Sequence, residues 1–283
     1  MSPEPRPIVF LSDYGLDDDF VGICHAVMAR ISPRSSVIDL SHAIPPHDVL
    51  RGALALHRSL PFLPAEAVVL AVVDPGVGTP RLPVAVETDR HARLLVGPDN
   101  GVLSLAWLQE EGVRAAVEIT SPSVRLEPVS TTFHGRDIFA PAAAHLAAGM
   151  SLASLGPPVD PSSLVALALP RAGVDGGEIA AEVLGVDRFG NVQLSARPDD
   201  LRSAGMAELR RLDLVAGGRS TTVGRAATFG EVPEGAFGLI VDSGGWLAVV
   251  LNRGNAAESL GLAAGDPVSL QPGPNPSGSA AGT

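Results

Sequence analysis

The fold is decided by a continuous apolar run and the loop that ends it, AVVLAVVDPGVG at residues 67–78. Seven apolar residues in a row, four of them valine, are typical of a strand that is buried on both faces of a parallel sheet. Asp74, Pro75 and Gly76 then end the strand and begin a loop. Because ligands of open α/β sheets bind beyond the carboxyl ends of the parallel strands, Asp74 stands where a site would form.

Outward from this strand, short apolar runs alternate with helical patterns. The predicted strands are 8–11, 37–40, 84–87, 94–96 and 116–119, and the predicted helices are 20–31, 48–60, 101–111 and 134–148. This alternation is typical of an α/β fold. We therefore predict an N-terminal Rossmann-like α/β domain with a mostly parallel sheet over residues 1–165.

The pattern changes after residue 165. Residues 157–177 are rich in Pro, Gly, Ser and Asp, and a linker is predicted at 166–177. Short apolar runs separated by Gly, Asn or Asp follow, at 178–186, 192–195, 212–215, 220–223, 238–241 and 247–251. They predict a smaller C-terminal antiparallel β-barrel domain over 178–271. Residues 272–283, made mostly of Gly, Pro, Ser and Ala, are expected to form a disordered tail.

Composition excludes several classes of function. The 283 residues carry 31 acidic and 20 basic side chains, a net charge of −11, and every basic residue is arginine. An acidic chain is a poor binder of nucleic acid, and a chain without lysine has no Schiff-base or P-loop lysine. One cysteine excludes a disulfide framework. No leader-like or membrane-spanning apolar run is present, so we expect a soluble cytoplasmic protein with no membrane partner.

Several polar residues follow predicted strands. Asp13 follows the first strand, Asp74 the strand at 67–73, and Asp99 with Asn100 a later one. A helix N-cap or a turn role explains each of these residues about as well as a site role does. The loop after Asp13 lacks the glycines of a phosphate-binding loop, and a carboxylate at a strand end can accept the hydroxyls of a ribose. Position alone thus indicates a nucleoside site without a phosphate to hold.

Seven motifs taken together are highly specific. They are FLSDYGLDDDFVG at 10–22, IPPHDV at 44–49, VVDPGVGTPR at 72–81, VGPDNGVL at 96–103, TFHGRDIFAPAAAHLA at 132–147, DRFGNVQLS at 187–195 and VDSGGWLAVVLNRGNAAESLGL at 241–262. In these motifs the chain resembles the S-adenosylmethionine (SAM) hydrolases, or SAM hydroxide adenosyltransferases, which are related to fluorinase and chlorinase. The resemblance implies an α/β domain followed by a small barrel, and a homotrimer whose sites lie between neighbouring subunits.

The resemblance also implies an activity and its residues. Water or hydroxide attacks the ribose C5′ of SAM, and adenosine and methionine are released without a cofactor or a metal. The residues that match the catalytic set are Asp74, Arg81 and His134. The residues that match substrate-binding positions are Asp13 for the ribose, Asp187 for the ammonium, Ser243 for the carboxylate, Asn191, Asn252 and Arg253 beside the adenine, and His47.

The chain departs from the halogenase pattern at informative positions. The halogenases carry Tyr at the position of Asp74, Thr at Val77, Ser at His134 and Trp at His47. An anionic Asp74 would repel a halide, so the pattern favours water as the nucleophile. Gly244 stands where relatives often have an arginine beside the serine, which weakens the match at the carboxylate. Three alternatives stay open at this stage, namely a halogenase, a non-catalytic adenosine- or SAM-binding protein, and a metal-dependent nucleotide hydrolase.

Overall fold

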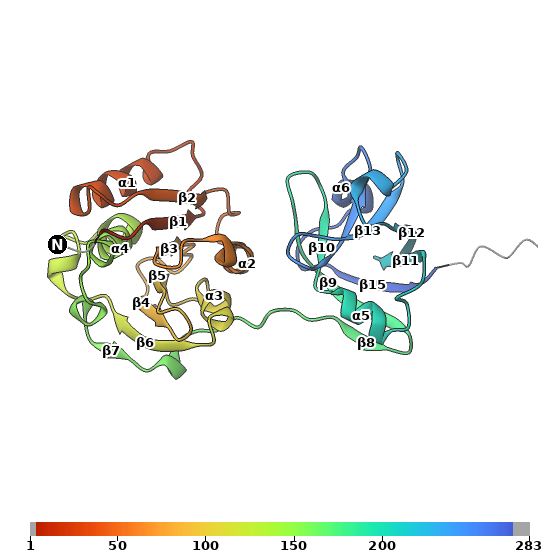
Figure 1. The fold of residues 1–283 in the computed structure, drawn as a ribbon. Helices are drawn as coiled ribbons and strands as arrows, with labels where there is room; N and C mark the ends of the chain where they lie inside the picture. Colours follow the sequence, from red (N-terminus) through yellow and green to blue (C-terminus); the bar gives the residue numbers. More distant parts are fainter. Residues whose placement is uncertain (1–3, 274–283) are drawn as a thin grey trace, which may run out of the picture. The chain divides into compact units, whose positions relative to one another are not determined.

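The computed structural model describes residues 4–273 and divides the chain into two compact units, Met1–Ala168 and Leu169–Thr283 (Figure 1). The boundary falls within the segment 166–177 that was expected to be a linker, and a short strand, β8 Gly173–Asp175, also lies in this segment. The expected tail lies, from residue 274 onward, outside the described residues.

The first unit holds seven strands and the larger helices. The strands are β1 Ile8–Ser12, β2 Val37–Ser41, β3 Val68–Val72, β4 Pro83–Thr88, β5 Leu94–Pro98, β6 Val113–Glu118 and β7 Pro158–Val159. The helices are α1 Phe20–Ile31, α2 Val49–Ser59, α3 Ser104–Gln109 and α4 Ala140–Ala147, with a π turn at Gly135–Phe139 that runs directly into α4. Short 3-10 turns lie at Leu60–Phe62, Pro122–Val124, Leu152–Leu155 and Pro161–Ser163. No helix among residues 4–273 has the length and apolar content needed to cross a membrane.

The sheet of the first unit is mixed. Its strand order is β2-β1-β3-β5-β4-β6-β7. The pairs from β2 to β5 are parallel, whereas β4, β6 and β7 join the sheet antiparallel. The α/β prediction is confirmed for the parallel core strands. The antiparallel part arises because only residues 89–93 connect β4 to β5, and a parallel crossover needs a dozen residues or more.

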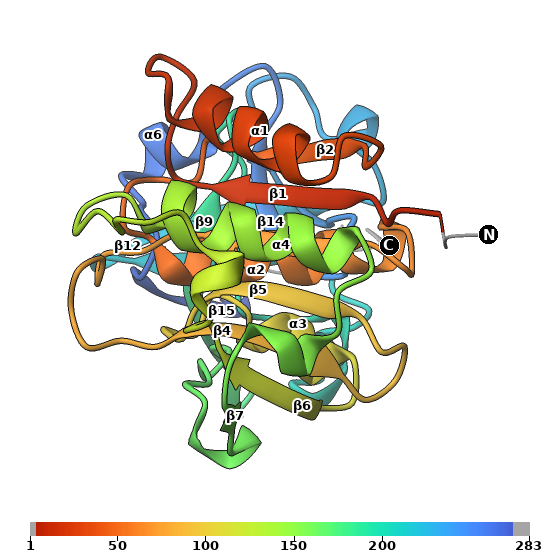
Figure 2. The ribbon, with the colours of Figure 1, turned by 90° about the vertical axis from the view of Figure 1, so that its left-hand side faces the viewer.

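The parallel core strands are buried on both faces, as the apolar run at 67–73 predicts. Ile8 and Phe10 of β1 pack on the side of α1 and α4, whereas Val9 and Leu11 pack on the side of α2 and α3. All four side chains are fully buried. Figure 2 shows α1 and α4 side by side over one face of this sheet. The two layers of helices leave the carboxyl ends of the strands as the edge where polar loops gather.

The second unit is a closed barrel. Its strands are β8 Gly173–Asp175, β9 Glu178–Val186, β10 Val192–Leu194, β11 Arg211–Ala216, β12 Arg219–Arg225, β13 Phe237–Val241, β14 Leu247–Leu251 and β15 Pro267–Pro272. Two short helices, α5 Pro198–Ser203 and α6 Ala256–Leu260, and a 3-10 turn at Phe229–Glu231 complete it. The order β10-β14-β13-β12-β11-β15-β9 closes through the pairing of β9 with β10. The predicted barrel is confirmed, with one parallel pair, β12–β13, among antiparallel neighbours.

Candidate active site

Two carboxylates lie at the ends of adjacent parallel strands. Ser12 of β1 pairs with Val72 of β3, and the backbone N–H of Asp13 donates to the carbonyl of Val72 over 3.4 Å. Asp13 and Asp74 therefore follow neighbouring strands at the same edge of the sheet. The amide of Asn100, which follows β5, donates to the carbonyl of Val73 at 2.8 Å and fixes the chain just before Asp74.

The loop after β3 folds back so that Arg81 reaches Asp74. Gly78 has a φ of +76°, and a Cβ at this position would lie 2.6 Å from the carbonyl oxygen of Thr131, so only glycine fits this close approach. Arg81 Nε donates to Asp74 Oδ1 at 2.9 Å and to Oδ2 at 3.1 Å, and Nη2 also donates to Oδ2. The two side chains are only 9% and 6% exposed. The result is a largely buried ion pair at the edge of the sheet.

The same arginine also holds His134. Arg81 Nη2 lies 2.8 Å from Nδ1 of His134. Since a guanidinium can only donate, Nδ1 must accept, and His134 is then neutral with its proton on Nε2. Burial and the neighbouring charge of Arg81 lower the pKa of His134, which agrees with this tautomer. Asp74, Arg81 and His134 thus form one hydrogen-bonded chain in which the histidine presents an N–H donor.

Asp13 is held by the backbone of His47. The N–H of His47 donates to Asp13 Oδ2 at 2.9 Å, and His47 has a positive φ of 68°. Asp48 then caps helix α2 by accepting from the N–H of Arg51 at 2.9 Å. The backbone of His47, whose side chain is exposed, therefore orients the carboxylate that was predicted to meet a ribose.

Tyr14 is a residue of this site that the sequence analysis did not select. Its ring contacts those of Phe20 and Phe133, each with centroids 5.9 Å apart. Burial raises the pKa of Tyr14 well above its usual value, and the nearby Cys24, Asp13 and Asp74 raise it further. A neutral phenol therefore lies close to both carboxylates. The available signal was its position directly after Asp13 in the motif at 10–22.

In the second unit, Asp187 and Asn191 share one turn between β9 and β10. Asp187 Oδ1 accepts from the backbone N–H groups of Phe189 at 2.8 Å and Asn191 at 3.0 Å. The side-chain amide of Asn191 donates to Asp187 Oδ2 at 2.7 Å. The carboxylate thus stabilises its own turn. An Asp in a turn of this sequence is expected to do so whether or not a ligand binds. It nevertheless remains exposed to solvent.

The remaining predicted residues lie around β14. Ser243 is exposed in the turn between β13 and β14, where Asp242 Oδ1 accepts from the N–H of Gly244 at 2.8 Å. Asn252 and Arg253 follow β14 at its other end, so the five residues of that strand separate them from Ser243. The Asn252 amide donates to the carbonyl of Val232 at 2.6 Å. Described contacts therefore join Asp187 to Asn191 but do not join Ser243 to Asn252.

Within the described part of the chain, no predicted site residue belongs to a group of side chains that could hold a metal ion. Among residues 4–273, the one group of three or more His, Cys, Asp or Glu side chains close enough to share an ion is His25, Asp39 and His42. The chain Asp74–Arg81–His134 has one carboxylate and one imidazole, and an arginine lies between them. The reactive group that this chain of residues offers is the Asp74 carboxylate, which Arg81 holds in a fixed orientation.

Family models and known proteins match this chain along most of its length. Residues 8–156 match the family model of the SAM hydroxide adenosyltransferase N-terminal domain, and residues 181–269 match that of the C-terminal domain. A protein of Salinispora tropica named (R)-S-adenosyl-L-methionine hydrolase is 49% identical, over 94% of this chain and 97% of its own. A protein of the same name from Thermus thermophilus is 47% identical, over 94% and 99% of the two chains.

More distant likenesses complete the comparison. The crystal structure of an uncharacterised conserved protein from Thermotoga maritima matches with a TM-score of 0.85 and 35% identity, covering 93% of this chain and 99% of that one. A relative named fluorinase, from an Actinoplanes species, shares 28% identity over 94% of this chain and 97% of its own. The Salinispora and Thermus proteins named as hydrolases are thus more similar to this chain than the fluorinase is.

Proposed function

The chain belongs to the SAM hydroxide adenosyltransferase family, and from this we infer that it hydrolyses S-adenosyl-L-methionine to adenosine and L-methionine. Relatives that bear this activity in their name align over nearly the whole length of both chains. The observation that carries the mechanism is the hydrogen-bonded chain Asp74–Arg81–His134 at the edge of the sheet.

We propose that Asp74 binds the attacking water and takes its proton. The water oxygen forms a bond to ribose C5′ while the bond from C5′ to sulfur breaks, and the electron pair of that bond stays on sulfur. The leaving group is then the neutral thioether of methionine, which needs no proton, so a general acid is not required. The proton released from the water passes to the Asp74 carboxylate and from there to solvent.

Arg81 and His134 are positioning residues in this proposal. Arg81 fixes the Asp74 carboxylate through Nε and Nη2 and cannot itself take a proton, because a guanidinium keeps its charge. His134 accepts at Nδ1, so its Nε2–H is the group that it can offer to a water or a ribose oxygen. Asp74 is thereby left as the proton acceptor within the chain of three.

The charge of the site suits the substrate and not a halide. SAM is a sulfonium cation, and its positive charge disappears as the C5′–S bond breaks. Asp13 and Asp74 present carboxylates to it, whereas the same carboxylates would repel fluoride or chloride. We therefore expect no 5′-halogenated adenosine when halide salts are added.

Labelled water gives the direct test of this function. The purified protein is incubated with SAM in H₂¹⁸O, and adenosine and methionine are measured by mass spectrometry. We expect equal amounts of the two products and one ¹⁸O in the 5′-hydroxyl of adenosine. SAM binding without methionine release would instead identify a binding protein, and halide-dependent product would identify a halogenase.

We also propose that Asp13 and His47 bind the ribose side of SAM, and that Asp187, Asn191, Ser243, Asn252 and Arg253 bind its methionine and adenine parts from the barrel of a neighbouring subunit in a homotrimer. The support is the family resemblance, together with the exposed polar turns that carry Asp187 and Ser243. No metal or cofactor takes part in this proposal.

Subunit mixing tests the shared site. Asp74→Ala and Asp187→Ala chains, each inactive alone, are co-expressed and purified together. If a site combines the first unit of one subunit with the second unit of another, some sites in mixed trimers are intact and activity returns. Absence of recovery in verified mixed oligomers would contradict the shared site, and sedimentation of the unaltered protein measures the oligomer. The expected cytoplasmic location stays a prediction that cell fractionation tests.

A further inference from the structure

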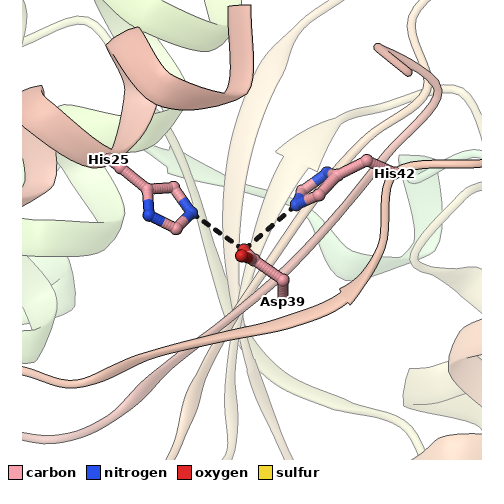
Figure 3. A group of neighbouring side chains, drawn as sticks. All are labelled: His25, Asp39 and His42. Atoms are coloured by element: carbon pink, nitrogen blue, oxygen red, sulfur yellow. Dashed lines mark hydrogen bonds and ion pairs between the residues drawn. The ribbon is translucent and has the colours of Figure 1, made fainter. Parts of the chain in front are cut away.

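Three side chains outside the proposed active site converge on one point. His25 comes from α1, Asp39 from the middle of β2, and His42 from the residues just after β2 (Figure 3). His25 Nε2 lies 2.8 Å from Asp39 Oδ1, and His42 Nε2 lies 3.0 Å from the same oxygen. The two imidazole nitrogens and the carboxylate oxygen all lie within 4.8 Å of one another.

His42 has a buried ring nitrogen that faces the carboxylate of Asp39. Its side chain is only 3% exposed. Nδ1 is hydrogen bonded to Ser12 Oγ at 2.7 Å. Nε2 faces Asp39 Oδ1 at 3.0 Å and makes no other hydrogen bond among residues 4–273. When the imidazole is neutral with its lone pair on Nε2, two acceptors face each other in a buried place, and a cation held between them satisfies both.

The ring of His42 is held in place before any ion arrives. Phe10 of β1 is the register partner of Asp39 in β2. Its ring meets the imidazole of His42 edge-on, with centroids 4.6 Å apart, and that of His25 at 6.2 Å. With a metal on Nε2, the Nδ1–H of His42 donates to Ser12 Oγ, which is the support that metal-binding histidines usually have. Because the His42 side chain is already fixed, metal binding costs little further conformational entropy at this residue.

We propose that His25, Asp39 and His42 form a binding site for a divalent transition metal ion, with Zn²⁺ the best fit. Two imidazoles and one carboxylate are a common set of protein ligands for Zn²⁺, whereas Mg²⁺ and Ca²⁺ prefer oxygen ligands alone. The ligand atoms of a tetrahedral zinc lie about 3.3 Å apart, so a small rotation of the half-exposed His25 completes the site. Solvent reaches the fourth position, since His25 and Asp39 are 35% and 43% exposed.

The ion would act as a structural clamp and take no part in hydrolysis. It ties α1 to β2, the edge strand of the sheet, and to the loop that begins at His42. This loop also supports the neighbourhood of Asp13, because the carbonyl of His42 accepts from the N–H of Gly15 at 2.8 Å. We therefore expect the ion to raise thermal stability and to leave the reaction chemistry unchanged.

Metal titration of the full chain tests the proposal. Protein purified without a polyhistidine tag is dialysed against a chelator and titrated with Zn²⁺ by calorimetry and with Co²⁺ by visible absorption. We expect one ion per chain, a higher Tm with Zn²⁺, and Co²⁺ bands typical of tetrahedral nitrogen and oxygen ligands. His25→Gln and Asp39→Asn should each weaken binding at least tenfold and abolish the Tm shift.

A matched control separates this cluster from other histidine–carboxylate pairs. His91 lies 2.7 Å from Glu110 in the first unit, and His91→Gln should bind the ion as the unaltered protein does. Circular dichroism and SAM hydrolysis check that each variant is folded. The proposal is overturned if the unaltered protein shows no saturable binding near one ion per chain. Equal affinity in His25→Gln, or octahedral Co²⁺ bands alone, would overturn it as well.

Discussion

The hydroxyl of Tyr14 lies directly against the backbone of Gly135. A Cβ at position 135 would stand 1.9 Å from Tyr14 Oη and 3.0 Å from Cζ, which no packed structure tolerates. Gly135 begins the π turn that follows His134, so this contact joins the segment of Asp13 to the segment of His134. Glycine is required here by space, because the backbone at this position does not have a positive φ.

Gly135→Ala should therefore displace Tyr14 or the π turn. We expect a loss of stability of about 1–3 kcal/mol, typical of overpacking, and a reduced kcat as His134 moves. Urea unfolding and adenosine release measure the two effects. Adding Tyr14→Phe removes the closest atom and should restore part of the stability, so a double mutant that is no more stable than Gly135→Ala would contradict this account.

Replacing Asp74 should separate chemistry from folding. Asp74→Asn keeps the shape of the side chain but not its charge, and we expect kcat to fall by about 10²–10⁴-fold through loss of the proton acceptor. Asp74→Ala also leaves the buried Arg81 without its carboxylate partner, which costs about 3–5 kcal/mol of stability. Adenosine release and urea unfolding distinguish the two losses.

The matched control for Asp74 is Asp213→Asn. Asp213 accepts from Thr222 Oγ1 at 2.8 Å on the exposed surface of the barrel, far along the chain from the proposed acceptor. Its replacement should leave kcat unchanged. Near-normal turnover in Asp74→Asn would instead remove Asp74 from the mechanism.

Arg81→Lys keeps the positive charge but removes the planar guanidinium, whose several N–H groups can donate at once. A lysine cannot hold both the carboxylate and His134 Nδ1 in this geometry, and each lost charge-assisted bond is worth about 1.5–3 kcal/mol, so kcat/KM should fall about 10- to 100-fold. Arg81→Met should in addition raise the pKa of His134, because the arginine charge lowers it. NMR titration of the His134 ring measures this shift, and an unchanged or lower pKa would disprove the link.

The acid side of the pH profile should depend on His134. Protonation removes the Nδ1 lone pair that Arg81 requires and places a second cation beside it. Since burial and Arg81 lower the pKa of His134, we expect kcat/KM to decline at a pH below about 6.5, the usual value of histidine. His134→Asn keeps an acceptor without titrating, so its profile should lack this inflection; an identical acid limb in the two proteins would exclude His134 as its cause.

The free energy of unfolding should also fall as the pH becomes more acidic. The unfolded chain binds the His134 proton near pH 6.5 and the folded chain only at lower pH, so this contribution is intact above pH 6.5 and is lost as the pH falls through the folded value. Burial also lowers the pKa of His145, which acts in the same direction in both proteins. Comparing the unaltered protein with His134→Asn therefore isolates His134.

The strand at 67–73 could be read from sequence because burial on both faces leaves an unbroken apolar run. The strand at Pro267–Pro272 was missed because proline stands at both of its ends and only four residues between them carry the alternating pattern. Helices α5 and α6 were missed as well, because five or six residues are too short to show a helical period. Local pattern thus locates long or fully buried elements, and tertiary pairing decides the short ones.

The proposed site could likewise be predicted from the sequence only in part. Asp13 and Asp74 could be placed at one sheet edge because strand ends in a parallel sheet meet there. That Arg81 joins Asp74 to His134, 53 residues further on, depends on the fold of the loop at 74–81 and no local pattern reveals it. Tyr14 was missed for a related reason, since an aromatic residue beside a strand is usually an ordinary part of the core.

Barrel closure in the second unit also bears on self-association. A strand with an unpaired edge is a template for aggregation, and closure leaves the second unit with only the three-residue β8 at such a position among its described strands. The sheet of the first unit ends in β2 and β7. β2 carries the charged Asp39 at its centre, and β7 is two residues long and begins with Pro158, which has no N–H to donate. Each of these edges thus discourages the addition of a foreign strand.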